Sequence, residues 1–148
     1  MKKIIFEELF INKAGIEDKR VVLRAFNSDD PIQQSTNIAF IENESDVILP
    51  DEYFREAWIL DKKTKKLGIN KEKAINIHID KLRVKRNEAL KKLDIETTIA
   101  TQQKDNTKLD KIAEKAQKLR DMPETAKLEL EALDDFEAIK NYIPEGSE

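Results

Sequence analysis

The sequence predicts an α+β protein: a small N-terminal antiparallel β-unit followed by a long antiparallel helical hairpin and a short C-terminal helix. Three observations predict this fold. Short apolar runs separated by turn-forming residues occupy the first 60 positions, apolar residues recur every three or four positions between residues 71 and 121, and a short capped stretch follows near residue 135. At 148 residues the chain is about one domain long, enough to bury a core.

Strands are predicted where short runs are rich in β-branched and aromatic side chains. These runs are residues 3–6, 20–26, 37–41, 46–49 and 57–60. Turn-forming clusters separate them, as in an antiparallel meander, at residues 12–15, 27–31 and 42–46. Residues 7–11 fit either a continued strand or a helical turn.

Two short segments connect the strands to the helical part. Pro50, followed by acidic residues, predicts a single helical turn over residues 50–56, because proline and acids favour the start of a helix. The lysine-rich residues 62–66 predict a solvated hairpin tip or a linker.

A long amphipathic helix is predicted from residue 71 to about residue 103, with Asn70 as its N-cap. At about 1.5 Å per residue such a helix is roughly 50 Å long. A small β-unit cannot cover that length. The far end of the helix therefore either projects freely or packs on another chain.

A second helix is predicted after the polar break at residues 104–107, and the two helices should pair as an antiparallel hairpin. Thr107 with Asp110 fits a capping box at the start of this helix. Pro123 predicts its end near Asp121, because the residue before a proline disfavours the helical conformation.

Charge is distributed unevenly along the chain. Residues 1–70 carry 11 basic and 13 acidic side chains, residues 71–121 carry 14 and 9, and residues 122–148 carry 2 and 8. A short helix is predicted at residues 134–142 within the acidic tail, which is expected to dock on the basic hairpin. These breaks predict three parts, which are a β-rich domain at 1–66, a helical hairpin at 67–123 and an acidic segment at 124–148.

Composition argues against several classes of function. With no Cys and one His, the chain lacks disulfides, zinc–thiolate sites, cysteine nucleophiles and histidine clusters. Three glycines leave no phosphate-binding loop, and no known catalytic motif is present. The longest apolar run, residues 57–60, is too short to cross a membrane. We therefore expect no enzyme activity, cofactor, metal, small-molecule substrate or membrane partner.

His78 is the one side chain that titrates near neutral pH. It lies beside the apolar side of the first predicted helix, so a packed or capping histidine is favoured over a general base. A base would need a nucleophile and an orienting partner, and the sequence suggests neither. The acidic residues 42–46 lack the ligand spacing of a calcium loop, which favours a plain hairpin loop.

A basic stretch on the first helix, residues 81–92, is the feature that would favour nucleic acid binding. Asp80 and Glu88 dilute its field, no aromatic residue lies among the basic ones, and the net charge of the chain is −3. A solvated helix face is favoured, and nucleic acid is not an expected partner.

Trp58 and Arg86 each allow two interpretations. Trp58 is either a core anchor where sheet and hairpin meet or a hot spot for a partner protein. Arg86 lies on the apolar side of the first helix and needs an acceptor, for which Asp121 and backbone carbonyls are candidates. Alternatively its stem runs along the edge of the helix pair with the charge in water.

Several blocks occur in a fixed order along residues 54–144. They are F-R-E-A-W at 54–58, A-I-N-I-H-I-D-K-L-R at 74–83, R-N at 86–87, L-D-I at 93–95, Q-K-L-R-D-M-P at 117–123 and F-E-A-I-K-N-Y-I-P at 136–144. Their order and spacing resemble a family of small phage-encoded proteins of the tail region. The L-R-D-x-P block is also similar to one in tail fibre assembly proteins.

The chain departs from the family pattern in places. Lys81 replaces the usual Arg, the turn between the helices lacks its usual Gly, and residues 142–143 replace a Trp. Residues 1–50 carry no resemblance.

The resemblance implies a non-enzymatic phage protein of the virion, structural or tail-associated, that binds other phage structural or tail proteins and allows a homo-oligomer. Its expected location is the virion, or the host cytoplasm during assembly. The candidate partner-binding residues are Trp58, Arg83, Arg86, Asn87, Arg120 and Asp121. The alternative is a non-virion tail fibre assembly chaperone, and a third option is a host-directed regulator that binds nucleic acid through residues 81–92.

Overall fold

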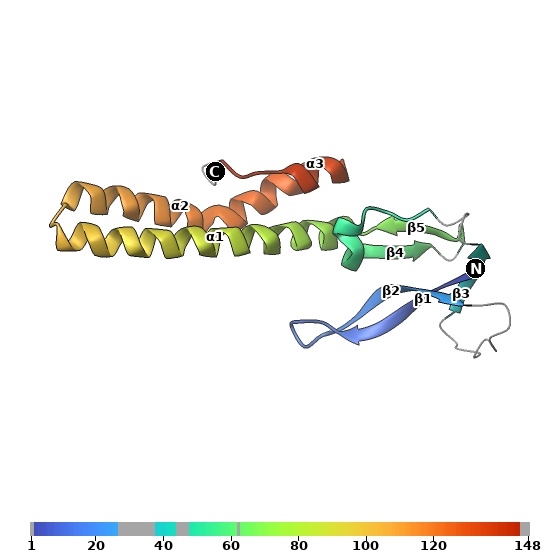
Figure 1. Cartoon of the computed structure of the whole chain (residues 1–148). Helices are drawn as coiled ribbons and strands as arrows, with labels where there is room; N and C mark the ends of the chain where they lie inside the picture. Colours follow the sequence, from blue (N-terminus) through green and yellow to red (C-terminus); the bar gives the residue numbers. More distant parts are fainter. Residues whose placement is uncertain (1, 27–37, 44–47, 62, 146–148) are drawn as a thin grey trace. The chain divides into compact units, whose positions relative to one another are not determined.

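The computed structural model describes residues 2–26, 38–43, 48–61 and 63–145, and it has the predicted α+β fold (Figure 1). Its elements are β1 Lys2–Ile11, β2 Glu17–Phe26, β3 Ile38–Asn43, the 3₁₀-helix η2 Glu52–Ala57, β4 Trp58–Asp61, β5 Lys66–Ile69, α1 Lys71–Gln102, α2 Asn106–Glu131 and α3 Phe136–Asn141. The chain divides into two compact units, Met1–Ala74 and Ile75–Glu148, with the boundary inside α1. The three-part division expected from the charge breaks stays a prediction.

The first unit contains a three-stranded antiparallel sheet in the order β2–β1–β3. β1 and β2 pair along their whole length, ending with Ile11 opposite Glu17. Residues 7–11 therefore continue the strand, which decides between the two alternatives left open by the sequence.

A tight turn at residues 12–15 closes this hairpin, as predicted. The Asn12 side chain accepts the backbone N–H of Ala14 at 3.0 Å and that of Ile16 at 3.1 Å. Gly15 adopts φ = 75°, a left-handed conformation that costs glycine little because it has no Cβ.

β4 and β5 form a second, two-stranded antiparallel sheet. β4 corresponds to the predicted run 57–60, whereas β5 was not predicted, because a glycine and neighbouring lysines dilute its apolar residues. The lysine-rich segment before β5 is a hairpin tip: the Asp61 side chain accepts the N–H of Lys63 at 2.9 Å, and Lys65 has φ = 55°.

The prediction of a strand at residues 46–49 is wrong for its second half, since Ile48 and Leu49 are exposed and belong to no strand. Their neighbours at positions 46 and 47 lie outside the described residues, as do the predicted turn at 27–31 and most of the turn at 42–46.

The helical turn predicted after Pro50 is η2, whose start is capped by Asp51, since this side chain accepts the N–H of Tyr53 at 2.9 Å. Strands of both sheets contribute to one apolar cluster in the first unit. Its members are Val21, Trp58 and Leu60, with Leu23, Leu67 and Ile69 packed against them.

α1 begins where the sequence predicts and ends within one residue of the predicted position. Asn70 is its N-cap, because the Asn70 side chain accepts the N–H of Lys73 at 3.0 Å.

A Schellman turn joins α1 to α2. The N–H of Lys104 donates to the carbonyl of Thr101 at 3.1 Å, and the N–H of Asp105 donates to that of Ala100 at 3.0 Å. This pattern requires a left-handed residue, and Lys104 takes that place with φ = 55°. Glycine is the usual residue there, so this turn carries local strain.

Asp105 caps α2, which corrects the predicted capping box of Thr107 with Asp110. The Asp105 side chain accepts the N–H of Lys108 at 3.0 Å, and Thr107 lies inside the helix. The Schellman turn explains the difference, because it brings Asp105 directly into the N-cap position.

Pro123 does not end α2, which continues to Glu131, so the predicted end near Asp121 is wrong. A proline inside a helix removes a hydrogen bond and crowds the preceding turn, and α2 is bent along its length (Figure 1). Met122, Ala126 and Leu130 carry the apolar side past the proline and are buried. Burial of these side chains offsets the local cost of the proline.

The two helices pack along one side each, in a contact that we call the seam. Near the turn the seam contains Leu93, Ala100 and Ile112, with Leu109, Ala116 and Leu119 beside them. Farther from the turn it contains Leu82, Met122 and Ala126, with Tyr142 packed against them. The predicted antiparallel hairpin is therefore confirmed.

The predicted third helix is α3. Its N-cap is Asp135, whose side chain accepts the N–H of Glu137 at 3.2 Å, and Ile139 on its inner side is fully buried.

We expect Lys104→Gly to stabilise the chain by about 0.5–1 kcal/mol. A left-handed non-glycine residue costs about 1–2 kcal/mol, which the substitution removes. About 0.5–1 kcal/mol of this gain is lost again, because the glycine backbone loses more entropy on folding. The measurement is the midpoint of urea unfolding at an unchanged slope. Lys108→Gly, inside α2, is the matched control and should destabilise. A lower midpoint for Lys104→Gly would contradict the assignment of the turn.

Candidate partner-binding surfaces

Tyr142, directly after α3, connects the C-terminal segment to both long helices. Its carbonyl accepts a hydrogen bond from Nε2–H of His78 on α1 at 2.9 Å, and its hydroxyl donates to the carboxylate of Glu129 on α2. The rings of His78 and Tyr142 meet edge to face, with centroids 6.2 Å apart. The acidic tail therefore docks on the hairpin as expected, held by a buried imidazole and apolar packing.

His78 is 4% exposed, which confirms the interpretation as a packed histidine. Burial lowers the pKa of the imidazole below its usual value, the bond to the Tyr142 carbonyl acts in the opposite direction, and Lys81 and Lys85 lower the pKa further. Burial and the bond to Glu129 raise the pKa of Tyr142 to about 12, so its hydroxyl stays a donor. The imidazole is neutral at pH 7 and serves as a structural donor.

The candidate residues on α1 bond to near neighbours on the same helix. Arg83 pairs with Asp80 at 3.0 Å, and both side chains are more than half exposed. Arg86 is half-buried, and its Nε and one terminal nitrogen donate to the Asn87 side chain at 3.2 and 3.0 Å. The hydrogen bonds of Arg86 thus stay on α1.

The candidate residues on α2, Arg120 and Asp121, are exposed. Asp121 accepts a hydrogen bond from Gln117, one turn earlier, at 2.9 Å. The internal brace between Arg86 and Asp121 that the sequence allowed is not formed. A role for these residues in partner binding stays a prediction.

Trp58 belongs to the first unit and is only 3% exposed, so it is an interior residue of that unit. Its indole Nε1–H donates to the carbonyl of Asp51 at 3.1 Å, and the Arg55 guanidinium lies 5.9 Å from the ring centroid. These contacts are those of a core anchor. In this conformation the ring is not accessible to a partner, so the six candidates do not form one cluster.

The first unit has an open hollow of about 480 Å³ beside Trp58, lined from the β1–β2 hairpin, β4 and the start of α1. At its edge the Lys73 ammonium lies 2.7 Å from the Asp18 carboxylate and holds the pKa of that carboxyl below its usual value. Among the described residues no buried side-chain polar atom lacks a hydrogen bond. The charges of Lys73 and Asp18 at the edge of the hollow are thus paired with each other.

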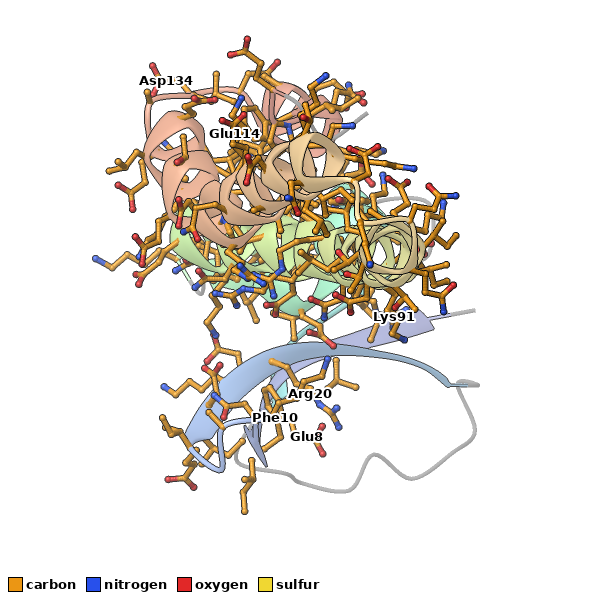
Figure 2. All side chains as sticks on the ribbon, turned by 90° about the vertical axis from the view of Figure 1, so that its left-hand side faces the viewer. Glu8, Phe10, Arg20, Lys91, Glu114 and Asp134 are labelled. Atoms are coloured by element: carbon orange, nitrogen blue, oxygen red, sulfur yellow. The ribbon has the colours of Figure 1, made fainter. Side chains whose placement is uncertain are left out.

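The same end of this hairpin carries a second internal pairing. Arg20 lies over the ring of Phe10 at 5.2 Å and bonds the Glu8 carboxylate at 2.8 Å, and the three side chains gather on one face of the hairpin (Figure 2).

The outer face of α1 is the side opposite the seam, and it carries three exposed apolar side chains. Val84 is 60% exposed, Ile95 63% and Ile99 42%. Eleven residues, close to three helical turns, separate Val84 from Ile95, and Ile99 lies one turn further, so all three share one face. The stronger apolar side of α1 dominates the sequence pattern, so this second face was not predicted, although the same helical spacing reveals it.

No cluster of three or more potential metal ligands occurs within the described part of the chain. None of its described helices is both long enough and apolar enough to span a membrane. No protein-family model, curated protein or solved structure matches this chain.

We expect the stability of the wild type to fall as pH drops below about 6.5, the value of an unperturbed imidazole. The folded pKa of His78 is the lower one, so the unfolded chain binds more protons between the two values. Stability is therefore complete above that window and is lost as pH falls through it. Urea midpoints at pH 7.5, 6.5 and 5.5 measure this effect.

His78→Gln is the control, because glutamine keeps a donor for the Tyr142 carbonyl and does not titrate. Its midpoint should change less with pH than that of the wild type. Parallel pH profiles for the two chains would show that His78 does not cause the effect.

Proposed function

We propose that this chain is a virion structural or tail-associated protein of a phage that acts by binding other phage proteins through the outer faces of its helical hairpin. The observation that carries the proposal is the exposed apolar face of α1, formed by Val84, Ile95 and Ile99. Apolar residues aligned along one helix face are typical of surfaces that receive another polypeptide.

The assignment to a phage is supported by the ordered sequence blocks, which lie mainly on the hairpin. The blocks at residues 74–83, 86–87 and 93–95 fall on α1, and the block at residues 117–123 falls on α2. The resemblance is therefore concentrated on the part of the chain that carries the proposed binding surfaces.

The chaperone alternative rests on the acidic tail and on the L-R-D-x-P block, which resembles the end of a helix in tail fibre assembly proteins. In this chain α2 continues through Pro123 to Glu131, so the block does not end a helix here. The chaperone, like the nucleic acid-binding regulator, is therefore kept as an outcome of the test.

We expect to find the chain in purified phage particles. Mass spectrometry of the particles and of the soluble fraction of the same lysate measures how much of the chain each fraction contains. Recovery from particles in a constant ratio to the other structural proteins supports the proposal. Recovery only from the soluble fraction, in complex with fibre protein, indicates the chaperone. Absence from particles contradicts the proposal in either case.

Replacement of Arg86 by Met tests whether this residue contacts a partner. Because its guanidinium, within the described part of the chain, donates to the Asn87 side chain beside it, we expect the free energy of unfolding, measured by thermal melting, to change by no more than about 0.5 kcal/mol. Incorporation of the variant into particles should fall. Lys127→Met, which breaks an exposed pair with Glu131 at 4.0 Å, is the matched control. A large loss of stability with normal incorporation would make Arg86 an internal brace.

A further inference from the structure

The outer face of α1 carries a pattern that is typical of helix pairing. Val84, Glu88, Lys91 and Ile95 follow each other at spacings of four, three and four residues, and all four side chains are exposed. At about 100° per residue they fall within roughly 60° of the helix circumference. Figure 2 shows Lys91 on the side of α1 that points away from α2. Alternating spacings of three and four residues are those by which one helix packs along another.

The same spacing continues along α1 in both directions. Ile77 and Lys81 come before these four residues, and Thr98 and Gln102 come after them. We define these eight positions, from 77 to 102, as the outer strip. It is roughly 38 Å long, so it offers a second seam on the side of α1 that α2 does not cover.

The spacing of the outer strip is symmetric about a point between residues 89 and 90. Val84 and Ile95 lie equally far from this point on its two sides, and so do Glu88 and Lys91. A two-fold rotation about this point therefore exchanges one apolar residue with another and the acid with the base. A strip with this symmetry is complementary to a second strip of the same sequence that runs in the opposite direction.

We propose that the outer strip binds the outer strip of a second copy of this chain, with the two α1 helices antiparallel. Val84 of each copy then lies beside Ile95 of the other, and Glu88 lies beside Lys91 of the other. Each dimer thus contains two apolar contacts and two ion pairs. The contact is isologous, because the same surface is used on both copies, so association ends at the dimer.

The two charges in the middle of the strip determine the direction of the pair and its register. In a parallel pair Glu88 would meet Glu88 and Lys91 would meet Lys91, and like charges at facing positions disfavour that partner arrangement. In an antiparallel pair shifted by one heptad, either Lys91 would face Ile95 or Glu88 would face Val84. A charge set against an apolar side chain loses water without gaining a partner.

The dimer is expected to be weak. Lys85 and Lys92 lie on one flank of the strip, and these flanks of the two copies meet, although Glu96 lies among them and the lysine stems can extend into water. A single pair of helices also buries less than the roughly 1,600 Å² of a standard interface. We expect a dissociation constant of about 100 μM, measured by sedimentation equilibrium as a mass that rises from one copy to two.

Charge reversal in the middle of the strip tests the pairing. Glu88→Lys and Lys91→Glu each replace both ion pairs by contacts between like charges, so each should weaken the dimer at least about tenfold. The double variant that carries both changes restores two ion pairs and should dimerise like the wild type. Glu114→Lys, at an exposed position of α2, alters the net charge as Glu88→Lys does and should leave the dimer intact.

Introduced thiols test the register, since the chain has no cysteine. A short bifunctional thiol reagent should join Val84→Cys to Ile95→Cys when the two variants are mixed. Each variant alone should give at least about fivefold less crosslinked dimer, because equivalent positions of the two copies lie roughly 16 Å apart along the helix axis. A parallel pair would instead join each variant to itself.

The apolar contacts are tested by Ile95→Ser, which should weaken the dimer about tenfold because both contacts lose one side. Ile143→Ser, at another exposed isoleucine, is the matched control and should not change dimerisation. Circular dichroism and thermal melting of every variant confirm that it is folded.

A wild type that stays monomeric up to about 1 mM protein overturns the inference. Failure of the double charge swap to restore a dimer that either single change has weakened also overturns it, as does crosslinking of each thiol variant to itself. The inference rests on the proposed function only in treating the outer face of α1 as a protein-binding surface. Recovery from particles of a chain that is monomeric alone would overturn the dimer and leave the proposed function standing, whereas a dimeric chain absent from particles would do the opposite.

Discussion

The constraint on which the rest of the second unit depends is that two long helices share a single seam. Each helix of a pair can bury only one side against its neighbour. In α1 that side includes Leu82, Leu93 and Ala100, and α3 with Tyr142 covers a further part. On the side of α1 away from the seam, the apolar side chains of Val84, Ile95 and Ile99 are exposed. The proposed function rests on this face, because apolar side chains aligned on one helix face are typical of surfaces that receive another polypeptide.

The same seam explains the errors of local prediction in α2. Pro123 and Thr107 each have a strong local preference, for a helix end and for a helix cap, and neither preference is followed. Continued burial at Met122, Ala126 and Leu130 stabilises the helix past the proline, and Schellman geometry places Asp105 at the cap. Local rules describe energies of about 1–3 kcal/mol, which the packing of several buried side chains can exceed. Where no such competition existed, the local rules held: Asn70 is the predicted cap of α1, and the helix predicted at residues 134–142 is present with Asp135 as its cap.

Much of the fold could be predicted because its periodicities are strong: α1, the hairpin and the β1–β2 turn all follow from spacing and turn chemistry. β5 could not, since its strand character comes from pairing with β4 rather than from its own residues. The candidate site was less predictable. The interior position of Trp58 depends on a cluster built from both sheets, and the bonds of Arg86 depend on a choice between Asn87 and Asp121 that composition does not determine.

The charge pattern of the hairpin becomes meaningful only once the seam is known. From the sequence, the lysines of residues 81–92 and the acids among them give a mixed, weak field. On the outer face of α1 the lysines stay mixed with acids, because Glu88 falls beside Lys81 and Lys92 on the helix. On α2, Asp110, Glu114, Asp121 and Glu124 lie together on the side opposite the seam. The negative field of the hairpin is therefore concentrated on one face of α2, and a field of one sign favours partners of the opposite charge.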